Sequence, residues 1–345
     1  MPPPPLRFAR LLLGAMAAAV AAGSATDATR IPSHPEKPGV ATIQGSAPPA
    51  PSTEPWFEMT VATSAVTFAE PAEMPPGAPP VKAEAGILVD MDSGEVLWER
   101  DQLQELPPAS LTKVLTSLVA LENLSPDRQV TITADALGQA SDDTVMGLKV
   151  GEVLTVQELL DGMLLPSGDD AASAIAVDTV GELRFVAAMN AQVAALGLQG
   201  AHFSNTSGLD DPELYASAYD LAVIATFTYD HYPLFDRIVD TPNIALPATP
   251  GHPAFNLWNL DALLQDYPAA VGIKPGWTGN AGACLIGMAV RDGHRLLAVL
   301  LNASYPAQLE ARLIDWGFQV EGLPPLLPPT PTPSPAPTPG GGAAA

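Results

Sequence analysis

The chain has 345 residues, with 15 Lys and Arg against 38 Asp and Glu, which gives a formal net charge of −23 at pH 7. This balance argues against nucleic acid or an anionic membrane surface as a partner, because both need a basic face on the protein. The 38 prolines gather toward the two ends, so the composition excludes a core built from the whole length and leaves one sizeable domain between the ends.

The N-terminus has the pattern of an export signal. Arg7 and Arg10 precede an apolar run over 11–22, and small residues follow at 23–25. This run is short for a membrane span. We therefore expect residues 1–25 to be a signal peptide, with membrane attachment only if it stays uncleaved. The mature protein is expected to begin near Thr26 and to be exported to the cell envelope or secreted.

The next segment, 26–84, is rich in Pro, Ala, Ser and Thr. Its lack of periodicity predicts a disordered stalk, with room for a short strand at 56–68. Two strand-like runs follow at 86–91 and 95–100, and the Asp-Ser-Gly sequence between them is typical of a hairpin turn. The packed domain is therefore expected to begin at residue 85.

A helix is expected after this hairpin. Pro107 and Pro108 stop any earlier helix, and apolar residues recur at helical spacing from Leu111 onward. Ser110 and Lys113 are three residues apart, so they lie on one face near the positive end of the helix dipole. A lysine in an apolar, positively polarised setting loses proton affinity and can take the proton of a serine hydroxyl. The alternative is a serine cap with an exposed lysine one turn on.

Apolar spacing predicts the remaining elements of the domain. They are a strand at 130–132, helices at about 155–164, 169–180, 182–196 and 217–231 with caps at Thr155 and Ser217, a loop-rich region at 240–270, strands at 271–274, 283–290 and 295–302, and a helix at 306–317. The pattern predicts an α+β fold over 85–318, in which an antiparallel sheet formed from both ends of the domain is flanked by helices beside a helical subdomain. The proline-rich remainder, 319–345, is expected to be a disordered tail.

The sequence predicts neither a metal site nor a disulfide. Cys284 is the single cysteine, and it lies in an apolar run, so we expect a small buried side chain. The five histidines do not pair at the spacing of metal ligands. No metal and no cofactor are therefore expected.

Two further polar clusters change the interpretation of Ser110 and Lys113. Ser167-Gly168-Asp169 separates two apolar helices, and Lys274-Pro275-Gly276 lies at the end of a strand. Each alone indicates only a helix cap or a turn, but in this order the three clusters are the motifs of serine penicillin-recognising enzymes. Between about 85 and 305 the chain resembles the D-alanyl-D-alanine carboxypeptidase family, in the segments 90–97, 106–113, 147–152, 164–168, 207–212 and 218–222.

The resemblance implies a β-lactamase/transpeptidase-like fold and a serine-type D-Ala-D-Ala carboxypeptidase. Such an enzyme removes the terminal D-Ala from peptidoglycan stem peptides, binds β-lactams and uses no cofactor. Ser110 would be the acylated nucleophile, Lys113 its base and Ser167 a proton-relay hydroxyl. The backbone N–H groups of Ser110 and Trp277 would form the oxyanion hole. The residues implied in substrate binding are Lys274, Asp169, Gly276 and Trp277.

Two residues depart from the family pattern. Asp169 stands where the family has Asn, and an ionised carboxylate favours the charged form of Lys113, which opposes its use as a base. Pro275 stands where the family has Thr, so one backbone donor is lost together with the hydroxyl that contacts the substrate carboxylate in relatives. A catalytically degenerate wall-peptide-binding protein therefore remains an alternative, as does a serine β-lactamase-like or DD-endopeptidase hydrolase.

Overall fold

The computed structural model describes residue 61, residues 66–139 and residues 144–328. The expected signal peptide lies outside the described residues, as do most of the stalk, most of the strand expected at 56–68 and most of the C-terminal tail. None of the helices in the described ranges combines the length and the apolar content that crossing a membrane requires.

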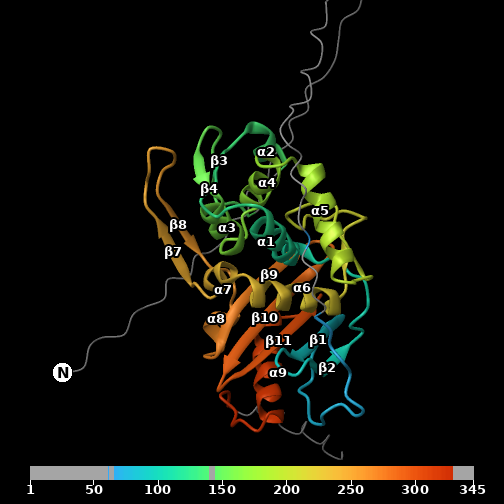
Figure 1. Cartoon of the computed structure of the whole chain (residues 1–345). Coiled ribbons are helices and arrows are strands. Elements are labelled where there is room, and N and C mark those ends of the chain that lie inside the picture. Colours follow the sequence, from blue (N-terminus) through green and yellow to red (C-terminus); the bar gives the residue numbers. More distant parts are fainter. Residues whose placement is uncertain (1–60, 62–65, 140–143, 329–345) are drawn as a thin grey trace, which may run out of the picture. The chain divides into compact units, whose positions relative to one another are not determined.

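Five strands form an antiparallel sheet with the order β2-β1-β11-β10-β9 (Figure 1). Two of them come from the N-terminal side of the domain and three from its C-terminal side, which confirms the sheet expected from both ends. In this order β9 is an edge strand. The bounds are β1 (Ala85–Asp90), β2 (Glu95–Arg100), β9 (Ala270–Thr278), β10 (Gly282–Arg291) and β11 (His294–Leu301).

The side chains of the sheet alternate between two hydrophobic cores. On β11, Leu297 and Val299 enter one core, whereas Leu296 and Leu300 enter the other. This is the two-residue period of a strand that is covered on both faces. Helix α6 (Ala218–His231) packs on the first face, and α9 (Pro306–Val320), with the short α8 (Leu263–Asp266), packs on the second (Figure 1).

The predicted helical subdomain consists of helices that pack on one another and, through α1, on α6 (Figure 1). Thr155 and Glu158 form a capping box at the start of α3, and Ser217 caps α6 by accepting from the Asp220 N–H, as expected for both residues. Helix α4 ends earlier than expected, and α2 was not expected. The bounds are α1 (Thr112–Asn123), α2 (Ala134–Gln139), α3 (Val156–Leu164), α4 (Asp169–Val177) and α5 (Glu182–Ala195).

The stretch 240–270, expected to be loop-rich, lies mostly outside helices and strands, but it also contains a hairpin and a short helix. Pro242 and Pro247 suggested loops, but they lie just outside β7, where a missing N–H removes no ladder bond. Helix α7 (Pro233–Val239) precedes the hairpin. The two-stranded pairs are β3 (Gln129–Thr131) with β4 (Val153–Thr155), β5 (Ala201–His202) with β6 (Tyr215–Ala216), and β7 (Asn243–Leu246) with β8 (Phe255–Trp258).

Residues on both sides of the expected domain also pack against it. Phe68 and Val81 are buried, and the Arg100 guanidinium donates to the Val81 carbonyl over 2.7 Å. At the other end, the Asp315 carboxylate accepts from the Leu326 N–H over 2.7 Å. The packed unit therefore extends beyond the boundaries expected at residues 85 and 318. A few anchoring contacts hold segments whose proline content alone suggests disorder.

Candidate active site

Ser110 lies in a tight turn that leads directly into a helix. The 3-10 turn η1 (Ala109–Leu111) is followed at once by α1, and Ser110 is the N-cap of neither. Two glycines let other parts of the chain approach this turn closely. A Cβ at Gly208 would lie 1.9 Å from the Ala109 carbonyl oxygen, and a Cβ at Gly276 would lie 2.9 Å from the Ser110 nitrogen. Glycine is therefore required where the backbone meets the Ser110 turn.

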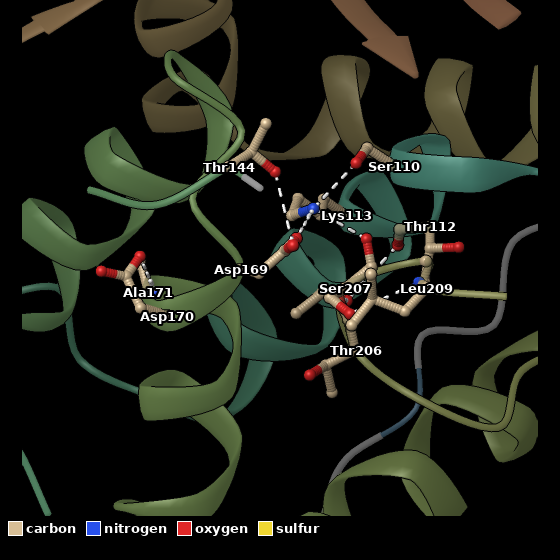
Figure 2. A network of polar contacts seen from close by, with 12 residues as sticks. Ser110, Thr112, Lys113, Thr144, Asp169, Asp170, Ala171, Thr206, Ser207 and Leu209 are labelled. Atoms are coloured by element: carbon tan, nitrogen blue, oxygen red, sulfur yellow. Dashed lines mark hydrogen bonds and ion pairs between the residues drawn. The ribbon is translucent and has the colours of Figure 1, made fainter. Parts of the chain in front are cut away.

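Lys113 reaches Ser110 from one turn further along the chain (Figure 2). Its side chain is completely buried. Its Nζ lies 2.9 Å from Ser110 Oγ, 2.6 Å from Asp169 Oδ1 and 2.7 Å from the Ser207 carbonyl oxygen. An ionised carboxylate and a carbonyl can only accept hydrogen bonds. They take two amine hydrogens and leave the remaining position of Nζ directed at the serine. The alternative of a serine cap with an exposed lysine is thus wrong.

Burial has the largest effect on the pKa of Lys113 and lowers it, because the charged ammonium loses its hydration. Asp169 opposes this shift through its charge and its hydrogen bond, and Asp170 opposes it through its charge. The net pKa lies below the ordinary value for lysine. A neutral Lys113 in this position presents its lone pair to the Ser110 hydroxyl, which is the geometry of a general base.

Asp169, at the start of α4, is fixed through both carboxylate oxygens. Oδ1 contacts Lys113, while Oδ2 accepts from Thr144 Oγ1 over 3.3 Å. The Asp169 N–H also donates to the Thr144 carbonyl over 2.8 Å, and the side chain is 3% exposed. The structure thus places Asp169 as the buried counter-ion of Lys113 (Figure 2). Sequence reasoning did not find Thr144, because a single threonine carries no motif.

Asp170 holds the segment that follows Thr144. Its carboxylate accepts from the backbone N–H groups of Met146, Gly147, Leu148 and Ala171 over 2.8 to 2.9 Å. These bonds join the Gly-Leu-Lys segment at 147–149 to the residue that follows the Ser-Gly-Asp cluster. Lys149 itself is exposed, so the segment serves to position Thr144 against Asp169 rather than to bring another lysine to the site.

The Ser207 carbonyl reaches Lys113 from a loop that Asn205 shapes. Asn205 Oδ1 accepts from the Ser207 N–H over 3.2 Å and from the Gly208 N–H over 2.8 Å. The Ser-Gly-Leu-Asp sequence at 207–210 was part of the resemblance, but no role was assigned to it. A backbone carbonyl is present at every position, so nothing in the residue type marked Ser207 as a partner of Lys113.

A groove of about 760 Å³ brings the predicted residues together, a volume that suits a peptide or a drug-sized ligand. Ser167 is 4% exposed and has a φ of +62°, a left-handed conformation that is uncommon for serine. The Trp277 side chain, by contrast, is 71% exposed. The predicted residues in the lining are Ser110, Ser167, Asp169, Pro275, Gly276 and Trp277.

Lys274 is completely buried next to Pro275, a residue of the groove lining. Its Nζ donates to the Pro275 carbonyl over 3.1 Å. Burial lowers the pKa of Lys274 well below its ordinary value, and the charge of Lys113 lowers it further. Pro275 lies in the edge strand β9, where a residue without an N–H is tolerated. Among the described residues, no group of three or more His, Cys, Asp or Glu side chains is arranged to hold a metal.

Comparisons with known proteins agree with this geometry. A family model described as D-alanyl-D-alanine carboxypeptidase matches residues 72–305. The chain is 38% identical over 263 residues to the D-alanyl-D-alanine carboxypeptidase DacB2 of Mycobacterium tuberculosis, covering 73% of this chain and 88% of that protein. It is 33% identical over 246 residues to DacF of Bacillus subtilis, covering 69% of this chain and 62% of that protein.

Solved structures show the same fold. A crystal structure of a D-alanyl-D-alanine carboxypeptidase from Mycobacterium tuberculosis matches with a TM-score of 0.66 and 38% identity, covering 73% of this chain and 96% of that one. The crystal structure of a DD-transpeptidase from Streptomyces matches with a TM-score of 0.65 and 28% identity, covering 70% of this chain and 99% of that one. The predicted β-lactamase/transpeptidase-like architecture is confirmed by the second match.

Proposed function

Because this chain belongs to the D-alanyl-D-alanine carboxypeptidase family, a family of serine peptidases, we propose that Ser110 forms the acyl-enzyme and that peptidoglycan stem peptides are the substrate. The observation that carries the proposal is the 2.9 Å contact between Lys113 Nζ and Ser110 Oγ. It joins a buried amine of lowered pKa to a hydroxyl at the wall of a groove. Such a pair is an activated nucleophile with its base.

The reaction proceeds in two halves. Lys113 takes the Ser110 proton, and Oγ attacks the carbonyl carbon between the two D-Ala residues. The backbone N–H groups of Ser110 and Trp277 donate hydrogen bonds to the carbonyl oxygen and stabilise the negative charge that develops on it. The departing D-Ala amine receives the proton, relayed from Lys113 through the Ser167 hydroxyl, and water then hydrolyses the ester on Ser110. The presence of Ser110 and Ser167 in one groove supports this sequence.

Members of this family act on the cell wall, outside the cytoplasm, which agrees with the export signal proposed for residues 1–25. That proposal rests on the two arginines, the apolar run over 11–22 and the small residues after it. If the segment is removed on export, N-terminal sequencing of the secreted protein will begin near Thr26. A chain that still begins at Met1 outside the membrane would show that the segment is retained.

Release of D-alanine tests the proposed function. The protein is expected to release the terminal D-Ala from a peptide ending in D-Ala-D-Ala, and to leave the terminal alanine of the matching peptide ending in L-Ala-L-Ala in place. A cross-linked peptide and a chromogenic cephalosporin, assayed beside it, separate the endopeptidase and β-lactamase alternatives. If none of these substrates is turned over by folded protein, the chain is the degenerate wall-peptide-binding protein instead.

The same assay measures the effect of Pro275. Pro275→Thr restores a hydroxyl and an N–H at the edge of β9, which borders the groove. One hydrogen bond to a charged group is worth about 1.5–3 kcal/mol, so we expect kcat/KM on D-Ala-D-Ala peptides to rise roughly ten- to a hundredfold. An equal or lower kcat/KM in Pro275→Thr would mean that the site holds the substrate carboxylate by another group.

A further inference from the structure

The groove beside Ser110 differs in charge between its two ends. Lys113 and Lys274 are buried against residues that line one end, where Lys113 contacts Ser110 and Asp169 and Lys274 contacts Pro275. At the other end the exposed carboxylate of Asp210 lines the groove. The described part of the lining includes no lysine or arginine. Asp169 also lines the groove, but its carboxylate is buried against Lys113, so the exposed charge of the lining is that of Asp210. This charge repels the carboxylate end of a peptide from the Asp210 end of the groove.

Asp210 is held in place by the end of β9 and the turn after it. Its Oδ1 accepts from Thr278 Oγ1 over 2.5 Å, and its Oδ2 accepts from the Asn280 N–H over 3.3 Å. Trp277, the residue before Thr278, lines the same groove with its indole 71% exposed. A fixed carboxylate beside an exposed indole suits an ammonium group on an aliphatic stem, because the ring can cover the methylenes and attract the charge.

The spacing along β9 fits a specific part of a peptide. From Lys274 to Thr278 the strand advances about 13 Å, at roughly 3.3 Å per residue. In an extended peptide whose last residue lies at the lysine end, the residue before D-Ala-D-Ala is two positions away, or about 7 Å. A side chain in an extended peptide stands roughly perpendicular to the backbone. Four methylenes reach about 6 Å, so by leaning along the strand toward Thr278 the amine can approach Asp210, which contacts Thr278.

We propose that Asp210 and Trp277 form a subsite for the cationic aliphatic side chain of a diamino acid, such as lysine, that directly precedes D-Ala-D-Ala in the substrate. The subsite selects stem peptides whose side-chain amine is free over those in which that amine is already acylated, as it is in a cross-link. This inference rests on the proposed function, because it takes Ser110 as the point at which the peptide is cut.

The test compares two peptides in the full-length protein. They are Nα-acetyl-L-Lys-D-Ala-D-Ala with a free ε-amine and the same peptide with that amine acetylated. We expect kcat/KM to favour the free amine roughly tenfold, the size of a hydrogen bond to a charged group. The preference should shrink as salt is added, because the pair lies at an accessible groove end. Asp210→Asn should bring the ratio of the two peptides close to one.

Asp211→Asn is the matched control, since Asp211 is exposed and lies outside the groove lining. This variant should keep the preference for the free amine. If wild-type protein cuts both peptides equally well at low salt, the subsite is absent although the enzyme is confirmed. If it cuts neither peptide, the proposed function fails instead. A preference that survives in Asp210→Asn, or that vanishes equally in Asp211→Asn, also overturns the assignment to Asp210.

Discussion

Benzylpenicillin is expected to form a stable covalent adduct on Ser110, and Ser110→Ala is expected to remove it completely. The strained amide of the drug meets the same hydroxyl, 2.9 Å from Lys113 Nζ, that the peptide bond meets. Acylation needs the nucleophile, its base and two N–H donors, whereas hydrolysis of the ester also needs an ordered water. The changes at Asp169 and Pro275 remove none of the groups needed for acylation, so labelling should persist even where turnover is slow.

Intact mass after incubation with the drug, followed by peptide mapping, measures this adduct. Lys113→Ala should lose nearly all of it, while Lys149→Ala should keep it, because Lys149 is an exposed lysine outside the site. Ser125→Ala, which changes an exposed serine after α1, is the matched control for Ser110→Ala. Folded wild-type protein that gains no mass over a wide range of pH and drug concentration would contradict the role given to Ser110.

The second large effect concerns pH. The rate of acylation should rise with pH as Lys113 loses its proton, and Asp169→Asn should move this rise to lower pH. Asp169 raises the pKa of Lys113 against the lowering effect of burial, so removing its charge lets that pKa fall further. An opposite charge at this distance is worth about one to three pH units, which at a fixed pH below the rise is roughly a ten- to thousandfold faster reaction.

Acylation rates measured between about pH 5 and 10 locate this rise in the wild type and in the variant. Asp292→Asn removes the same charge from the exposed turn between β10 and β11, at a residue whose φ of +50° asparagine tolerates. That control should leave the rise where it is. A midpoint unchanged in Asp169→Asn would mean that the proton on Lys113 does not limit the reaction.

The parts of the site that depend on local geometry could be predicted from the sequence. Ser110 and Lys113 meet because residues three apart share a helix face, and this needs no knowledge of the rest of the chain. The sheet could be predicted because strand-like runs flank a helical middle. Once the two motifs are placed in one site, it also follows from charge that Asp169 favours the protonated form of Lys113.

What could not be predicted depends on contacts between distant segments and on backbone groups. The Ser207 carbonyl binds Lys113 from a position far along the chain, and its usefulness comes from the loop shape that Asn205 imposes. The burial of Phe68 is not visible in a proline-rich segment, because it depends on a partner surface. The complete burial of Lys274, a residue implied in substrate binding, likewise arises from packing rather than from residue type.

The sheet joins the two ends of the domain, so it is complete only after the first and last strands have paired. Ala85 lies opposite Leu301, and the register continues along the whole of β1. The first strands to leave the ribosome therefore wait for the last strand before their apolar faces are covered. Such distant pairing implies a high contact order and slow folding. The entropy cost of closing a long loop comes before the favourable free energy of the contacts between the strands. A chain that folds late remains extended for longer, and an extended chain is the form that can be threaded through a membrane channel.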